Sequence, residues 1–204
     1  MSLITDNKEF SHYKKRVCEL LIPEKEIENN VFKDDFKFFL AFDFDYMYEE
    51  VFFDRIKHFL EKTDNSVLYF YTLSPSQEDY YYKQFGKYST FSININQTYK
   101  DLYDLLYEDP GNNTGNYVGV VSNDIVWFSD SDDWAIVASR DLEIAICAFT
   151  TLEMKKKFED SFNKTSIILS TVKLYIDSLN SMLSFNEKQW EYYNKIIQNH
   201  IDKD

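Results

Sequence analysis

Three carboxylates stand together between two tryptophans in a short polar break of the chain. Asp130, Asp132 and Asp133 lie between Trp127 and Trp134. Their oxygens suit hard cations, but a calcium loop needs ligands at positions one, three and five and a glycine at six. Counted from Asp130, position five is a tryptophan and position six an alanine, so the calcium motif is absent. The segment is either a turn of hydrated acids or a negatively charged contact site.

A second pair of carboxylates, Asp43 and Asp45, ends an apolar run. An apolar strand followed by Asp-x-Asp resembles the first motif of the haloacid dehalogenase group of phosphotransferases. The resemblance implies a nucleophile at Asp43, a general acid at Asp45 and a nearby Mg²⁺, with the second motif at Thr72. That group continues with Gly-Thr or a close relative, whereas this chain continues with Tyr46 and Met47. The alternative is a strand end whose acids face solvent or cap the next helix.

Other patterns of catalysis and metal binding are missing from the sequence. The three histidines are scattered, and no His or Cys spacing typical of zinc, no Gly-x-Ser-x-Gly and no phosphate-binding glycine loop occurs. Cys18 and Cys147 lie far apart in apolar surroundings, which predicts two buried free thiols. The sequence therefore predicts no metal and no cofactor, and it favours a non-enzymatic protein.

The charge balance points to the kind of partner. The 204 residues include 35 acidic and 22 basic side chains, for a net charge of −13. Such a surface opposes binding to nucleic acids and to anionic membranes, because both need clustered cations. It favours a basic protein partner, although the same charge also serves solubility alone. No apolar stretch has the length of a membrane span and no signal-peptide pattern is visible, so we expect a cytoplasmic protein.

The periodicity of apolar residues predicts an α+β fold with a mixed or antiparallel sheet, flanking helices, a β-meander and a C-terminal helical pair. We expect one domain over residues 1–204, which could be divided into an α/β-like part (1–107), the meander (117–149) and a helical part (151–204). The expected strands are Phe36–Phe44, Val67–Leu73, Thr90–Ile95, Ile125–Phe128, Trp134–Ala138 and Glu143–Phe149. The expected helices are Glu9–Leu21, Tyr46–Lys62, Gln77–Phe85, Thr98–Tyr107, Leu152–Phe162 (with Lys155–Lys157 on its exposed side), Ile167–Leu183 and Glu187–Ile201.

The leading hypothesis is a non-enzymatic acidic module that binds a basic protein. Bacterial immunity proteins that neutralise toxins share its size, charge and lack of catalytic motifs. The expected contact region is the turn Ser129–Trp134, where Asp130, Asp132 and Asp133 attract the partner and Trp134, beside Trp127, anchors it. Two alternatives stay open. One is a metal-assisted hydrolase or phosphotransferase that uses Asp43 and Asp45, and the other is a structural protein that buries its C-terminal helices against a second copy. The sequence does not specify the oligomeric state.

Overall fold

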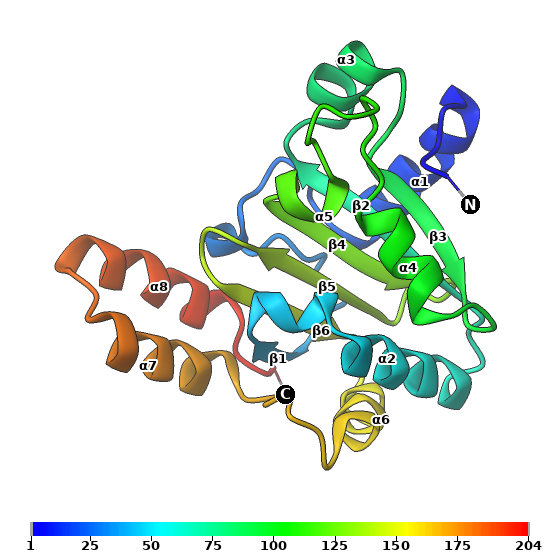
Figure 1. Ribbon diagram of the computed structural model, residues 1–204. Helices are drawn as coiled ribbons and strands as arrows, with labels where there is room; N and C mark the ends of the chain where they lie inside the picture. The colour runs from blue at the N-terminus through cyan, green and yellow to red at the C-terminus, as the bar shows by residue number, and fades with distance from the viewer. Residues whose placement is uncertain (1, 204) are drawn as a thin grey trace.

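A six-stranded antiparallel sheet forms the centre of the molecule. The computed structural model describes residues 2–203 (Figure 1). The strand order is β1 (Phe38–Phe42), β6 (Ile144–Phe149), β5 (Trp134–Ser139), β4 (Asp124–Ser129), β2 (Val67–Ser74) and β3 (Thr90–Asn94). Every neighbouring pair in this order is antiparallel. The predicted α+β class is confirmed, and β4, β5 and β6 form the predicted meander.

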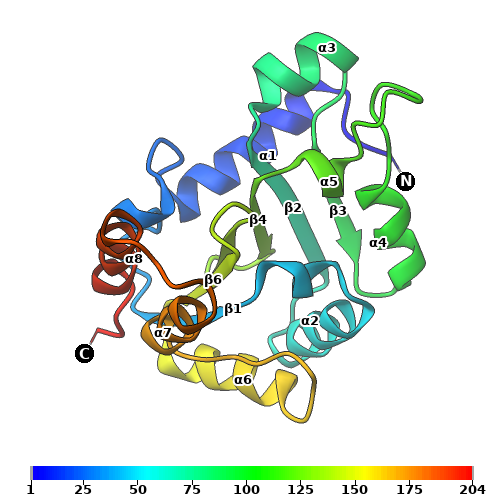
Figure 2. The same ribbon diagram turned by 60° about the vertical axis from the view of Figure 1, so that its left-hand side comes forward.

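Helices cover both faces of the sheet (Figures 1 and 2). One face packs against α2 (Glu50–Lys62), α4 (Tyr99–Leu106) and α6 (Leu152–Phe162). The other packs against α1 (Asn7–Leu20), α7 (Val172–Leu183) and α8 (Glu187–Asn199). Every residue of β5 and β6 is buried. The continuous apolar runs of the meander follow from this arrangement, because side chains that alternate between two covered faces must all be apolar.

Three predicted helices differ from the observed elements. The predicted helix Tyr46–Lys62 is interrupted at Glu49, where the 3₁₀ turn η2 (Phe44–Tyr48) ends and α2 begins. The predicted helix Ile167–Leu183 begins only at Val172, because the preceding residues run extended beside β1 and Thr171 caps the helix. Residues 77–85 form a π-helical turn, η3 (Gln77–Tyr82), followed by the short α3 (Lys83–Phe85). Two further short elements are η1 (Ile27–Asn29) and α5 (Val118–Val121).

The C-terminal segment covers the outer edge of β1. Ser170 exchanges two backbone hydrogen bonds with Ala41, at 2.8 and 3.0 Å. Further along, Asp202 accepts a hydrogen bond from the Phe39 backbone N–H (2.7 Å) and pairs with the Lys155 ammonium (2.5 Å). A covered edge strand is protected from pairing with other chains.

Two sequence-based predictions of side-chain burial were wrong. Lys155, expected on the exposed side of α6, is only 6% exposed, because it reaches the carboxylate of Asp202. Cys18 is exposed, because α1 buries Phe10, Tyr13, Val17 and Leu20 on its other side. Cys147 is buried in the sheet, as predicted.

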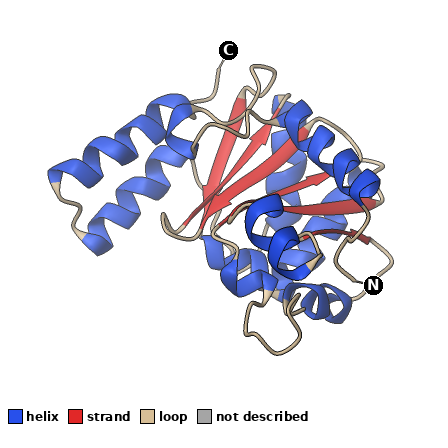
Figure 3. Ribbon diagram, turned by 90° about the horizontal axis from the view of Figure 1, so that it is seen from above, coloured by secondary structure: helices blue, strands red, loops and turns tan. Residues whose placement is uncertain are grey.

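The helices α7 and α8 form the predicted C-terminal pair, which projects from one side of the sheet (Figure 3). Asn186 and Gln189 form a capping box at the start of α8. Among residues 2–203, no helix has the length and apolar character needed to cross a membrane.

Candidate functional site

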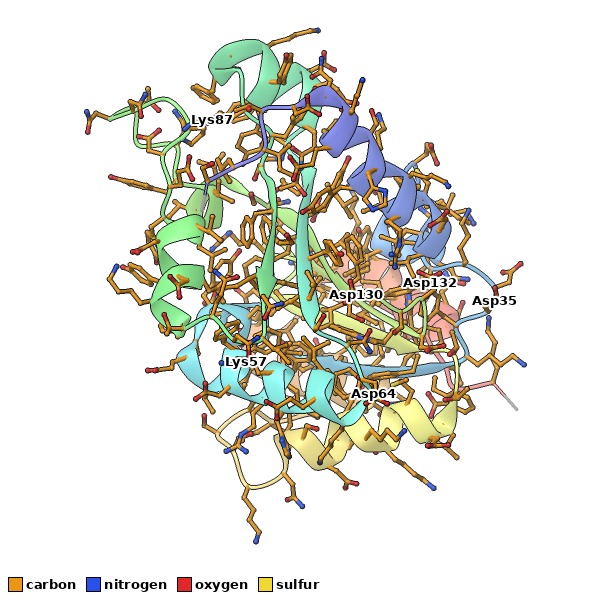
Figure 4. All side chains as sticks on the ribbon, turned by 90° about the vertical axis from the view of Figure 1, so that its right-hand side faces the viewer. Asp35, Lys57, Asp64, Lys87, Asp130 and Asp132 are labelled. Atoms are coloured by element: carbon orange, nitrogen blue, oxygen red, sulfur yellow. The ribbon has the colours of Figure 1, made fainter. Side chains whose placement is uncertain are left out.

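The turn between β4 and β5 uses its carboxylates to hold the fold together. Asp130 accepts hydrogen bonds from the Tyr69 hydroxyl (2.9 Å) and from the backbone N–H groups of Ser66 (3.3 Å) and Val67 (3.2 Å). Asp132 pairs with Arg16 of α1, with 2.8 Å between Oδ1 and Nη2. Asp130 and Asp132 lie close together near the C-terminal end of α1 (Figure 4).

The third acid of the turn, Asp133, has a partner that follows β6, the residue Thr150. Its Oδ1 accepts a hydrogen bond from the Thr150 hydroxyl (3.3 Å), and its backbone carbonyl accepts one from the Thr150 N–H (3.0 Å). Each acid of the turn thus has a partner within the chain, and the ion pair with Arg16 neutralises the charge of Asp132.

The two tryptophans beside the turn are completely buried. Trp127 packs edge-on against Phe70, and Trp134 packs edge-on against Phe59, with ring centroids 4.9 and 5.3 Å apart. A partner that approaches the turn in this conformation therefore reaches carboxylates and backbone but neither indole ring. The binding of a partner at this turn stays a prediction.

The strand-end carboxylates Asp43 and Asp45 lie at the start of η2. Asp43 caps this turn by accepting a hydrogen bond from the Asp45 N–H (2.9 Å), and Asp45 is exposed. Thr72, at the position of the second motif in the phosphotransferase resemblance, belongs to β2. Three strands separate β2 from β1 in the sheet. The fold therefore keeps these groups apart.

A cleft of about 380 Å³ opens where the loop after α1 faces the ends of β2, β4 and β5. We name it the acidic cleft, because four carboxylates but only one lysine line it. Tyr192 of α8 closes one side. The lining residues are Pro23, Glu24, Lys25, Glu26, Ile27, Val31, Leu73, Ser74, Asn123, Asp124, Val137, Ala138, Ser139, Asp141, Leu142 and Tyr192.

Long-range hydrogen bonds hold the walls of the acidic cleft. Glu28, directly behind the cleft, accepts a hydrogen bond from the Tyr192 hydroxyl (2.6 Å), and its backbone carbonyl accepts one from the Asn199 side chain (2.6 Å). On the opposite wall, Asn123 accepts a hydrogen bond from the Asp141 N–H (3.2 Å). The cleft is thus built from segments that the sheet and α8 fix in place.

Two carboxyl groups of the cleft have raised pKa values, so their ionised forms are disfavoured. Burial raises the pKa of Asp124, and the nearby charge of Asp141 raises it further, against hydrogen bonds from Ser139 and Asn123 that lower it. A hydrogen bond with Glu28 and the negative charge of that group raise the pKa of Glu26. Burial, a hydrogen bond that needs a protonated carboxyl group and the charge of neighbouring carboxylates all disfavour the ionised form of such groups.

The acids of the cleft form no ion pair among the described residues, although Lys25 also lines the cleft. Across residues 2–203, no ion pair includes Glu24, Glu26, Asp124 or Asp141. In the same part of the chain, no group of three or more His, Cys, Asp or Glu side chains is placed to hold a metal ion. The carboxylates are spread along the cleft, an arrangement that suits several cationic groups rather than one ion.

Sequence reasoning missed this cleft because its acids come from two distant parts of the chain. One local signal was present, since Glu24, Glu26 and Glu28 alternate directly after Pro23. Three acids within five residues predict a local concentration of negative charge, although the turn after Pro23 and the 3₁₀ element η1 give their side chains no regular alternation. Nothing local shows that Asp124 would lie near these acids.

Comparisons with protein-family models, with curated proteins and with solved structures gave no match to this chain. The site is therefore interpreted from its own geometry.

Proposed function

We propose that the protein is a non-enzymatic binding module that receives a basic segment of a partner protein in the acidic cleft. The observation that carries this proposal is a group of four carboxylates, Asp124 and Glu26 among them, that line one cleft with a single lysine and form no ion pair among the described residues. Lysine or arginine side chains of a partner would supply the missing positive charge. Neutralisation of a basic protein, as immunity proteins neutralise toxins, is the form of this function that we favour.

The electrostatics of the cleft support this choice over the turn. The acids of the turn already have Arg16, Thr150 and backbone N–H groups as partners, so a new cation would have to compete with them. In the cleft, a cation would favour the ionised forms of Asp124 and Glu26, whose pKa values are raised by burial, by a hydrogen bond with Glu28 and by neighbouring carboxylates. The net charge of −13 adds long-range attraction for a basic partner.

The test uses a short peptide of alternating lysine and serine as the basic probe, titrated into the purified protein by calorimetry. We expect it to bind the wild type and to bind the double variant Glu26→Gln, Asp124→Asn at least about tenfold more weakly, because charge pairs in such sites contribute about 1.5 kcal/mol or more. A peptide with glutamine in place of lysine should not bind.

The matched control is Glu159→Gln, Asp160→Asn, which removes two exposed carboxylates of α6 and so changes the net charge by two units, as the cleft variant does, but outside the cleft. It should leave the affinity within about twofold of the wild type, since distant exposed charges are screened at physiological salt. Equal affinity of the wild type and the double variant would exclude the cleft as the binding site.

A further inference from the structure

Exposed tyrosines form a continuous row on the helical layer that contains α4. Tyr103, Tyr107 and Tyr117 are 44%, 42% and 40% exposed. The ring centroids of Tyr103 and Tyr107 lie 4.3 Å apart with the rings nearly parallel, and Tyr117 lies 6.2 Å from Tyr107. The half-buried ring of Tyr99 lies 6.2 Å from Tyr103. We name these four rings the tyrosine ladder. Figure 2 shows α4 and α5, the elements beside it, next to each other.

The ladder is held in position before any partner arrives. Tyr99, Tyr103 and Tyr107 follow one another at intervals of four residues, which places them on one side of α4. The Tyr99 hydroxyl donates a hydrogen bond to the Tyr48 carbonyl (2.6 Å). Tyr117 follows a loop that Asp109 fixes through three hydrogen bonds of 2.7 to 2.9 Å. Rings that are already ordered lose little entropy on binding.

Two glutamates close to the ladder carry negative charges that no ion pair within residues 2–203 neutralises. Glu49 and Glu50 are exposed, and neither forms an ion pair with any described residue. Burial raises the pKa of Tyr99, and the charges of these two glutamates, close to the ladder, raise it further. Of the basic groups on this side, Lys100 pairs with Asp104 (2.5 Å), whereas Lys57 donates to the neutral Gln97 carbonyl (2.9 Å) and keeps its positive charge.

We propose that the tyrosine ladder is a contact surface for arginine side chains of a basic protein partner. A guanidinium group is planar, so it can stack on a tyrosine ring while its N–H groups reach a carboxylate such as Glu49 or Glu50. A second copy of this chain fits the ladder poorly, because each copy carries a net charge of −13.

In the sequence, Tyr117 of the ladder and Asp124 of the cleft are seven residues apart, on either side of α5. The inference rests on the proposed function only in taking the partner to be basic. It adds the side chain that the partner would use and a second surface that would recognise it.

The test compares two probes, the lysine-serine peptide and the same peptide with arginine in place of lysine. We expect the arginine peptide to bind the wild type more tightly by up to about fivefold, because a planar, weakly hydrated guanidinium stacks on the ring and a strongly hydrated ammonium gains less from such a contact. Fivefold corresponds to about 1 kcal/mol, the upper value for an exposed cation–π contact. The double variant Tyr103→Ala, Tyr107→Ala should lose this preference, whereas Tyr103→Phe, Tyr107→Phe should keep it because the rings remain. Leu174→Ala, which removes an exposed apolar side chain of α7, is the control and should keep it too.

The possible outcomes separate this inference from the proposed function. An arginine preference that persists in the alanine variant, or no preference in the wild type, overturns the ladder even if the cleft variants weaken binding. Loss of the preference in the alanine variant supports the ladder even if the cleft variants have no effect. Self-association of the wild type that the alanine variant abolishes, measured by light scattering, would show that a second copy occupies the ladder and would also overturn the inference. Circular dichroism establishes that each variant is folded. If the alanine variant is not folded, the double variant Tyr103→Leu, Tyr107→Leu, which keeps apolar volume but removes both rings, takes its place and should lose the preference.

Discussion

The buried imidazole of His200 should make the stability of the protein depend on pH. His200 is 3% exposed and lies edge-on between Phe32 and Phe39, with ring centroids 5.8 and 5.3 Å away. Its Nδ1 lies 2.8 Å from the Ile196 carbonyl oxygen, and its Nε2 has no hydrogen-bond partner among the described residues. Burial, together with the charge of Lys203, lowers the pKa of His200 from 6.5 to about 4.

The sign and size of the effect follow from this lowered pKa. The unfolded chain takes up a proton at His200 near pH 6.5 and the folded protein only near pH 4, so the stability is fully present above pH 6.5 and is lost as the pH falls. With 1.36 kcal/mol for each pH unit of difference, His200 should remove about 2 kcal/mol of unfolding free energy by pH 5 and about 3 kcal/mol by pH 4.

The assay is urea unfolding of the wild type and of His200→Gln at about pH 7.5 and about pH 5. Other titrating groups contribute equally to both proteins, so the difference between them isolates His200. We expect the wild type to lose about 2 kcal/mol more than the variant between these two pH values. An equal loss in both proteins would refute the reasoning that a neutral imidazole is buried at this position.

Further predictions concern the turn, the cleft and the thiols. Asp130→Ala should lower the unfolding free energy by about 1–2 kcal/mol, because the N–H groups at the start of β2 lose their acceptor. Asp132→Ala should lower it by about 1 kcal/mol or less, as is usual for exposed ion pairs. Urea titration compares the two variants, and equal losses of unfolding free energy would contradict this prediction. Asp124→Asn should raise the melting temperature at neutral pH by about 1–3 °C, because a carboxyl group with a raised pKa destabilises the fold when it is charged. A lower melting temperature of the variant would contradict the statement that the negative charge of Asp124 is unfavourable in the cleft. Of the two thiols, Cys18 should react with a thiol reagent in the native protein, but Cys147, whose pKa burial raises, only after unfolding.

The parts of the fold that depend on residues close together in the sequence could be predicted from it. The meander was recognisable because each strand is a short β-branched or aromatic run bounded by polar residues. The N-caps Thr151 of α6 and Asn186 of α8 are likewise local features, since an N-cap bonds within its own first turn. The break at Glu49 and the late start of α7 were missed, because contacts of η2 and Ser170 with the rest of the protein override the helical pattern.

The candidate site depends on contacts that no local pattern contains. Arg16 is 116 positions away from Asp132, and Tyr69 is 61 positions away from Asp130, so the sequence could not show that the acids of the turn are already occupied. The acidic cleft likewise joins Glu26 to Asp124 across nearly half the chain. The sequence therefore predicted an acidic binding protein, but it indicated the turn, and not the cleft, as the contact region.

The central claim is that a basic segment compensates the charge of the acidic cleft. The most direct measurement is the titration of the Asp124 and Glu26 carboxyl carbons by NMR, in the free protein and with the lysine-serine peptide bound. The free protein should show raised pKa values for both groups, and bound cations should lower them, because a nearby positive charge favours the ionised form. If the peptide binds and both pKa values stay unchanged, the basic segment lies elsewhere and the proposed site is wrong.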